Sequence, residues 1–327
     1  MTLLSKRLLF VTGKGGVGKS TVAAAVGTLA ARSGMRTIVA EVAGRNDVPH
    51  ALGHPRDEEL PEEIEAELSP GLFWISIDPQ HALREYLLDQ LRVRALAEVL
   101  GQSRAFGYLA AAAPGLQELL TVGKIWELAQ PRRRTPGAAP YDLVVVDAPA
   151  TGHGLAYLTA PRTFADIART GPVARQARTI HATLADPSRS GVIVVSTPHE
   201  LPVTEALLLH REVRRQMGLE LERTVMNALA PARFSERDAG RLREALAGGT
   251  GGAGGGGRAK RAPPLGSAEA GIRAALSQAS QARDQRRQVD RLRRGLGRAP
   301  TALPFMYTAA VGPEQVSVLA DCLERSL

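Results

Sequence analysis

The sequence contains few of the residues on which several classes of protein depend. Its 327 residues include a single cysteine, Cys322, which excludes a disulfide framework within the chain and a cysteine-based zinc site. Aromatic residues make up 4% of the chain, and no apolar run approaches the ~20 residues of a membrane-spanning helix. The N-terminal residues run directly into a strand pattern, without the features of a signal peptide. We therefore expect a cytoplasmic protein with no transmembrane segment.

Charge is distributed unevenly along the chain. Lysine and arginine total 41 against 33 acidic residues, which leaves a formal net charge of +8. Basic residues gather between Arg258 and Arg298, whereas the stretch from Asp57 to Glu67 is acidic. A positive excess suits an anionic partner such as a nucleotide, a nucleic acid or a membrane surface. A soluble surface with uneven charge explains the excess equally well, so composition leaves these alternatives open.

Strand-like and helix-like segments alternate along most of the chain. Short apolar runs rich in β-branched residues are typical of strands that are buried on both faces of a parallel sheet. We expect such strands at 7–13, 36–43, 72–78, 141–149, 191–198, 223–229 and 301–307. Helical patterns between them end at Gly34 and Gly218, as expected of glycine C-terminal caps. The alternation predicts an α/β fold with a doubly wound, mostly parallel sheet.

We expect residues 1–327 to form a single domain, although some segments interrupt the alternation. Residues 79–130 look wholly helical and predict a helical insertion beside the sheet, with a second helical subregion at 161–187. Residues 248–267 are rich in glycine and proline, which predicts a flexible linker. Residues 268–298 predict a basic, charged helix.

A glycine-rich loop lies between the first expected strand and the first expected helix. Its sequence GKGGVGKST, residues 13–21, fits the pattern G-x-x-x-x-G-K-[ST]. The glycines let backbone N–H groups approach phosphate oxygens, and the helix directs its positive end toward them. Lys19 is placed to reach the β- and γ-phosphates, and Ser20 is placed to bind Mg²⁺. The predicted nucleotide-binding residues of the loop are Gly13, Lys14, Gly15, Gly16, Val17, Gly18, Lys19, Ser20 and Thr21.

A nucleotide site of this kind also needs a carboxylate at the end of a neighbouring strand. Asp147 follows four apolar residues at the end of the expected strand 141–149. Capping of the strand end is the simpler explanation for such an aspartate, but the presence of the loop favours a role at the metal. We therefore predict that Asp147 takes part in catalysis and binds Mg²⁺ through water.

The loop holds a second lysine, Lys14, beyond the one that its pattern requires. The stretch KGGVGKST resembles the deviant Walker A group of P-loop ATPases, which includes ParA and MinD proteins, the nitrogenase iron protein and the ArsA arsenite-pump ATPases. In that group the extra lysine reaches across a dimer to the partner's phosphates. The resemblance implies ATP and Mg²⁺ as cofactors, a homodimer or a heterodimer with a related ATPase, and catalytic roles for Lys14 and Lys19. The alternative for Lys14 is a solvated surface lysine.

A second segment narrows the resemblance to one branch of that group. Residues 147–161, DAPATGHGLAYLTAP, resemble the switch II segment of the ArsA family and of its eukaryotic relative, the tail-anchored-protein-targeting ATPase. The resemblance implies that the backbone at Gly152 senses the γ-phosphate and that Asn227 contacts the adenine. Pro304 lies in a stretch similar to the C-terminal strand and loop of the family, near the base. The resemblance covers most of the chain outside 248–298.

The chain departs from the ArsA family at several positions. The family's switch I has an aspartate that positions the attacking water, and here Glu41 takes its place, with Asp47 as an alternative further along. A glutamate can still orient a water, so we predict a catalytic role for Glu41. One cysteine can build neither the family's metalloid site nor the zinc clamp of the targeting ATPase. Arsenite extrusion and a zinc-clamped dimer are therefore disfavoured.

We expect an ArsA-family ATPase that hydrolyses ATP with Mg²⁺ at a dimer interface and drives a conformational switch on an unknown protein client. A ParA- or MinD-like switch that binds DNA or contacts a membrane surface peripherally stays open, as does a weakly active nucleotide-binding subunit of a heterodimer. Nucleic-acid binding is disfavoured because the basic stretch 258–298 lacks interleaved aromatic residues for stacking on bases.

Overall fold

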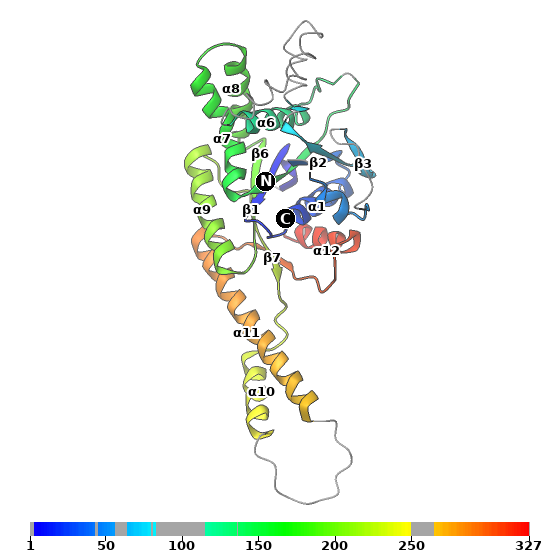
Figure 1. The fold of residues 1–327 in the computed structure, drawn as a ribbon, viewed down its shortest axis with the longest axis vertical. Helices are drawn as coiled ribbons and strands as arrows, with labels where there is room; N and C mark the ends of the chain where they lie inside the picture. The colour runs from blue at the N-terminus through cyan, green and yellow to red at the C-terminus, as the bar shows by residue number, and fades with distance from the viewer. Residues whose placement is uncertain are drawn as a thin grey trace, which may run out of the picture.

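A central eight-stranded sheet organises the molecule, with helices on both of its faces (Figure 1). The computed structural model describes residues 3–42, 45–55, 64–79, 81–82, 115–135, 137–249 and 265–326. The strand order is β3-β4-β2-β5-β1-β6-β7-β8, and all neighbouring pairs are parallel except β3 with β4. The strands are β1 (Leu8–Gly13), β2 (Thr37–Val42), β3 (Ala66–Ser69), β4 (Leu72–Ile77), β5 (Leu143–Ala150), β6 (Ser190–Ser196), β7 (Arg223–Leu229) and β8 (Thr301–Pro304). The predicted doubly wound, mostly parallel α/β fold is confirmed.

The central strands are buried on both faces because apolar residues occupy almost all of their positions. In β1, Leu8 and Phe10 belong to the core on one face of the sheet, whereas Leu9 and Val11 belong to the core on the other. Successive side chains of a strand point to opposite faces, so a continuous apolar run supplies both cores. This explains why these strands do not show alternating hydrophobicity.

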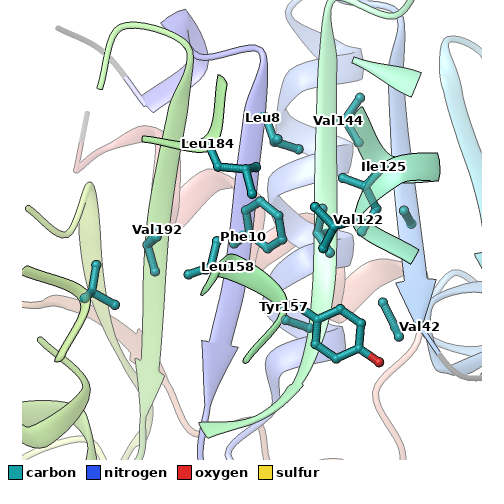
Figure 2. Close-up of a cluster of buried hydrophobic side chains, with 14 of the residues drawn as sticks. Leu8, Phe10, Val42, Val122, Ile125, Val144, Tyr157, Leu158, Leu184 and Val192 are labelled. Carbon is teal, nitrogen blue, oxygen red and sulfur yellow. The ribbon is translucent and has the colours of Figure 1, made fainter. Parts of the chain in front are cut away.

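In the described ranges, the helices that cover the first face of the sheet include α6 (Leu116–Leu128), α7 (Thr151–Ala168), α8 (Pro172–Leu184) and α9 (Glu200–Met217). Figure 2 shows Val122 and Ile125 of α6 and Leu158 of α7 gathered around Phe10 and Val144 of the sheet. Burial of such surface contributes about 25 cal/mol for each Å² of apolar area, which makes it the main stabilising contact between the layers. Helix α7 begins directly after β5, so its first turn lies at the end of that strand.

Helices α1 (Lys19–Arg32), α2 (Asp47–Ala51) and α12 (Pro313–Glu324) belong to the second face. Helix α1 approaches the sheet closely, since a Cβ on Gly27 would lie 2.7 Å from Cγ2 of Val39. Its small buried residues, such as Ala23 and Ala24, allow this approach. As a result, the first turn of α1 is held firmly at the end of β1.

Strand β3 lies outside the seven strands that the sequence predicts. It pairs antiparallel with β4 at the edge of the sheet. The turn that connects the two strands includes Gly71, which has φ +78°. Its four residues alternate between half-buried and exposed, so they form no apolar run. A short edge strand of this kind gives little signal in a search for buried strands.

The predicted helical segments fall partly within the described residues. Helix α6 lies in the segment 79–130, whereas residues 80 and 83–114 of that segment lie outside the described residues. The predicted subregion 161–187 holds the end of α7 and the whole of α8. A separate insertion remains a prediction.

Two further helices form an arm that extends beyond the end of the sheet opposite to α8 (Figure 1). They are α10 (Glu236–Gly249) and α11 (Leu265–Leu296), and they pack against each other. Residues 250–264, most of the predicted linker 248–267, lie outside the described residues. Helix α11 occupies the segment for which a charged helix at 268–298 is predicted.

Candidate nucleotide-binding site

The glycine-rich loop 13–21 lies at the carboxyl end of β1, between β5 and β6. Gly18 has φ +87°, and a Cβ at this position would collide with Nδ2 of Asn227. Gly15 and Gly16 are exposed, and no heavy atom of the described residues lies within 4 Å of a Cβ placed on either. The amides of the loop are therefore open to an incoming anion, and the N-terminus of α1 directs its positive end toward the same place.

The ammonium group of Lys19 is enclosed by the loop. The residue is 8% exposed, and Nζ donates a hydrogen bond to the carbonyl oxygen of Lys14 at 3.1 Å. Burial lowers the pKa of Lys19, while the carboxylate of Asp147 opposes the shift. A phosphate oxygen is a better acceptor for an ammonium group than a carbonyl, so it can take the place of the Lys14 oxygen.

Ser20 and Asp147 meet where the first turn of α1 faces the end of β5. Oγ of Ser20 donates to Oδ2 of Asp147 at 2.6 Å, and Asp147 is fully buried. Burial raises the pKa of Asp147, while Arg45, the hydrogen bond from Ser20 and the charge of Lys19 all act to lower it. Within the described part of the chain, Oδ1 of Asp147 has no hydrogen-bond partner. Such an oxygen needs a donor, and a water of a metal ion's hydration shell supplies one.

The donor set fits a metal that is bound together with a nucleotide. In the described ranges, no group of three or more Cys, His, Asp and Glu side chains could hold a metal ion by itself. Mg²⁺ typically takes one or two protein oxygens, several waters and phosphate oxygens of a substrate. The hydroxyl of Ser20 with Asp147 behind it matches that requirement, whereas a permanent structural metal does not fit.

The side chain of Lys14 turns away from its own loop. Its Nζ forms an ion pair with Oε1 of Glu205 in α9, and both side chains are about one-third exposed. The two lysines of the loop therefore have different partners, one on the backbone and one on a helix of the other layer. The function of Lys14 in a partner's site stays a prediction.

Glu41 lies next to Asp147 in the sheet, since the two residues are paired in the register of β2 and β5. It is fully buried, and its carboxylate accepts hydrogen bonds from Nε1 of Trp74 at 2.7 Å and from the amides of Asp47 and Val48 at 3.1 Å each. Burial raises the pKa of Glu41 to about 7, although the bonds from Trp74 and Val48 oppose the shift. In this conformation Glu41 ties β2 to β4 and to α2, and presents no oxygen to a water in the nucleotide site.

The other predicted site residues lie around the loop at different depths. Asn227, in β7, donates from Nδ2 to the carbonyl oxygen of Val17 at 2.9 Å, so its amide supports the loop itself. Pro304, at the end of β8, is paired with Leu229 rather than with the loop. Gly152 belongs to the first turn of α7. Adenine contacts for Asn227 and Pro304 and phosphate sensing at Gly152 remain predictions.

One residue of the site, Arg45, is not predicted from the sequence. Nη2 of Arg45 lies 3.1 Å from Oδ2 of Asp147 and donates to the backbone oxygen of the same residue at 3.0 Å. In the sequence, Arg45 belongs to the stretch EVAGRND and to no recognised motif, and Asp147 lies more than a hundred residues later. No spacing rule connects two such residues, because only the pairing of β2 with β5 brings their strand ends together.

Comparison with known proteins agrees with this geometry. Residues 6–170 match the model of a family described as anion-transporting ATPase, the ArsA-type ATPases. The chain belongs to this family. The ArsA-type chain is therefore an ATP-binding ATPase. Its glycine-rich loop and mostly parallel sheet are those of the P-loop NTPase fold.

Several curated proteins are similar to the chain. ATPase BagA of Mycobacterium tuberculosis is 32% identical over 243 residues, which cover 73% of this chain and 69% of BagA. A putative arsenical pump-driving ATPase of Halobacterium salinarum is 28% identical over 70% of this chain and 36% of its own length. ATPase ASNA1 homolog 1 of Paramecium tetraurelia is 28% identical over 47% of this chain and 43% of its own length. Among the residues that the structure describes, no helix is both long enough and apolar enough to cross a membrane.

Proposed function

We propose that the chain hydrolyses ATP with Mg²⁺ at the interface of a dimer, and that hydrolysis drives a conformational switch on a protein client. The dimer consists either of two copies of this chain or of this chain with a related ATPase. The observation that carries the proposal is the different placement of the two loop lysines. Lys19 is enclosed in its own loop, whereas Lys14 extends to Glu205 on the surface of α9.

In phosphoryl transfer, each residue of the site has a separate role. Lys19 stabilises charge on the phosphates of its own loop, and Lys14 does the same for the partner's nucleotide. Ser20 would hold the metal directly, and Asp147 would accept a hydrogen bond from one of the metal's waters through Oδ1. Mg²⁺, when bound, neutralises negative charge on the β- and γ-phosphates.

Recognition of the rest of the nucleotide involves the surrounding strands and α7. The backbone at Gly152 senses whether the γ-phosphate is present, because Gly152 lies in the first turn of α7, close after Asp147 in the chain. Asn227 and Pro304 border the base. A water-orienting role for Glu41 requires α2 to move, because the carboxylate is enclosed by Trp74 and the first amides of α2 in this conformation.

The client is proposed to be a protein rather than a metalloid anion. Relatives of this chain are named for arsenical pumps and as an ASNA1 homolog. The single Cys322 offers no set of thiolates for a metalloid, and it lies in α12 on the opposite layer from α6, α7 and α8. Helices α6, α7 and α8 and the arm of α10 and α11 are the parts whose packing would change with the nucleotide.

A weakly active subunit of a heterodimer is the second candidate function, and the enclosed carboxylate of Glu41 favours it. Turnover of the chain alone, compared with turnover beside related ATPases from the same cell, separates the two. An increase of at least about tenfold with one partner supports the heterodimer.

The proposal is tested by substituting the two lysines separately. Lys19→Ala should abolish hydrolysis and weaken nucleotide binding, because the cation nearest the phosphates is lost. Lys14→Ala should lower turnover by about 10²–10³-fold while the monomer still binds nucleotide, because the lost cation acts in the partner's site. Mixing the two variants should restore part of the activity, since each can supply what the other lacks. Wild-type turnover in Lys19→Ala would refute the proposal, and a parallel loss of nucleotide binding and turnover in Lys14→Ala would refute its dimeric part.

A further inference from the structure

A cation already stands against the buried carboxylate of the candidate metal site. The guanidinium of Arg45 is held by Oδ2 and the backbone oxygen of Asp147, by the backbone oxygen of Val42 at 3.2 Å, and by Asp47 at 3.6 Å. The Arg45 side chain is 32% exposed, whereas that of Asp147 is not exposed at all. Arg45 thus reaches in from the surface to neutralise a carboxylate that the sheet has buried.

Such neutralisation is needed when nothing else is bound. A buried carboxylate without a counter-charge is strongly unfavourable, and among the described residues the only other hydrogen bond to its oxygens comes from the hydroxyl of Ser20. Lys19 lowers the pKa of Asp147 through its charge but donates its hydrogen bond to Lys14. Arg45 is therefore the counter-ion that the resting site uses.

The same oxygen of Asp147 is shared by Arg45 and Ser20. Ser20 must turn its lone pairs to a metal ion if it is to bind one, and Asp147 must accept hydrogen bonds from that ion's waters. A guanidinium against Oδ2 repels a divalent cation that approaches the same carboxylate. The two cations therefore compete for one carboxylate.

Arg45 is also linked, through the start of α2 and Glu41, to Trp74, whose fluorescence can be measured. Two residues after Arg45, helix α2 begins, and the amides of Asp47 and Val48 donate to Glu41. Glu41 in turn accepts the indole N–H of Trp74. A displacement of Arg45 that moves the start of α2 changes the partners of Glu41 and hence the surroundings of Trp74.

We propose that Arg45 is the resting-state counter-ion of Asp147, that Mg²⁺ arriving with a nucleotide displaces it, and that its release moves the start of α2 away from Glu41. Arg45 is then a positioning residue that couples occupation of the metal site to the loop after β2. The proposal rests on the proposed function, since it requires a Mg²⁺–nucleotide complex at this site.

The test measures how much Mg²⁺ is needed to tighten nucleotide binding. A fluorescent, non-hydrolysable ATP analogue is titrated with MgCl₂, and the midpoint is compared between the wild type and Arg45→Gln. Removal of the competing charge should lower the Mg²⁺ midpoint by about tenfold, because the metal no longer has to displace a guanidinium. Asp47→Asn removes only one anchor of Arg45, and its side chain is half exposed, so it should shift the midpoint in the same direction by a smaller factor. Arg32→Ala is the matched control, since Arg32 forms an exposed ion pair with Asp321 on α12.

The second readout is the fluorescence of Trp74 in a Trp126→Phe background, where it is the single tryptophan of the chain. In an otherwise wild-type protein the emission should change when MgCl₂ is added to the analogue complex, and in Arg45→Gln most of that change should already be present without Mg²⁺. An unchanged Mg²⁺ midpoint in Arg45→Gln and Asp47→Asn, or an emission that does not respond to Mg²⁺, overturns the role of Arg45. Failure of the wild type to bind the analogue at any Mg²⁺ concentration overturns the proposed function itself and the role of Arg45 with it.

Discussion

Lys14 and Lys19 stand five residues apart in one loop, yet their ammonium groups lie in different surroundings. Lys19 is buried against the backbone, whereas Lys14 is partly exposed and bound to Glu205. An exposed ion pair is worth about 0–1 kcal/mol, so the contact with Glu205 holds Lys14 only weakly. At the scale of single residues, then, Glu205 holds Lys14 extended through a weak contact that a stronger anion could replace.

Substitution of Glu205 should make the predicted dimer form more readily. Glu205→Gln removes the competing charge, and a gain of about 0.5–1 kcal/mol for each Lys14 released corresponds to a twofold to fivefold lower dimer dissociation constant for each ion pair removed. Sedimentation velocity with MgCl₂ and a non-hydrolysable ATP analogue measures this constant. Glu200→Gln, in the first turn of the same helix, is the control and should leave it unchanged. A weaker dimer in Glu205→Gln would show that Glu205 supports the interface instead of competing for Lys14.

At the scale of elements, a buried charge network holds the segment between α6 and β5. The Arg133 side chain is fully buried; it donates to Glu127 at the end of α6 and forms an ion pair with Glu65, just before β3. Oη of Tyr141 donates to Oε2 of Glu65 at 2.6 Å. The network joins the edge strand to the helical layer. The Glu65 side chain is 24% exposed, so its loss should cost less than the ~3–5 kcal/mol that removal of one partner of a fully buried pair costs.

The stability that Glu65 contributes should depend on pH with a defined sign. Burial alone would raise the pKa of Glu65, but the hydrogen bonds from Arg133 and Tyr141 outweigh it and hold the pKa below the ordinary value of 4.5. A carboxyl whose pKa is lower in the folded state contributes stability that is fully present above pH 4.5 and is lost as pH falls through the folded value. Urea unfolding from pH 7 to pH 3 should therefore show a difference between the wild type and Glu65→Gln that shrinks at acid pH.

The matched control for this series is Glu67→Gln, two residues further along in β3. Glu67 accepts a hydrogen bond from the amide of Gly71 at an exposed position. Its substitution should change the unfolding free energy by less than about 0.5 kcal/mol at any of these pH values. A difference for Glu65→Gln that is independent of pH would contradict the role of its charge in the network.

The elements that sequence reasoning predicts are those whose signal is local. Apolar runs identify the buried parallel strands, and Gly218, with φ +68°, ends α9 as expected of a C-terminal cap. The loop lysine Lys19 and the strand-end Asp147 are found for the same reason. Strand β3, the enclosure of Glu41 by Trp74 and the counter-ion Arg45 depend on which strands become neighbours, and the linear sequence does not state that order.

At the scale of the whole molecule, a continuous line of contacts joins the nucleotide loop to the arm. Lys14 is paired with Glu205 in α9, and the neighbouring Thr204 accepts a hydrogen bond from Nη2 of Arg291 in α11 at 2.9 Å. Leu292 is fully buried in the core beneath α9. Beyond that point α11 packs against α10, away from the sheet (Figure 1). These contacts connect Lys14 with the part of α11 that holds Arg291 and Leu292.

Amide hydrogen exchange along α11 should reveal this division of the arm. Residues 285–296 include Gln285 and Leu292, which are buried against the body, so their amides should exchange at least about tenfold more slowly than those of 268–278. Addition of Mg²⁺ and a non-hydrolysable ATP analogue should alter exchange in α9 and in 285–296, because Lys14 leaves Glu205 when it meets a phosphate. In Lys14→Ala that nucleotide effect should disappear from α9 while protection of the loop 13–21 persists. Uniform exchange along α11, or a nucleotide effect confined to the loop in the wild type, would show that the arm is not connected to the site through α9.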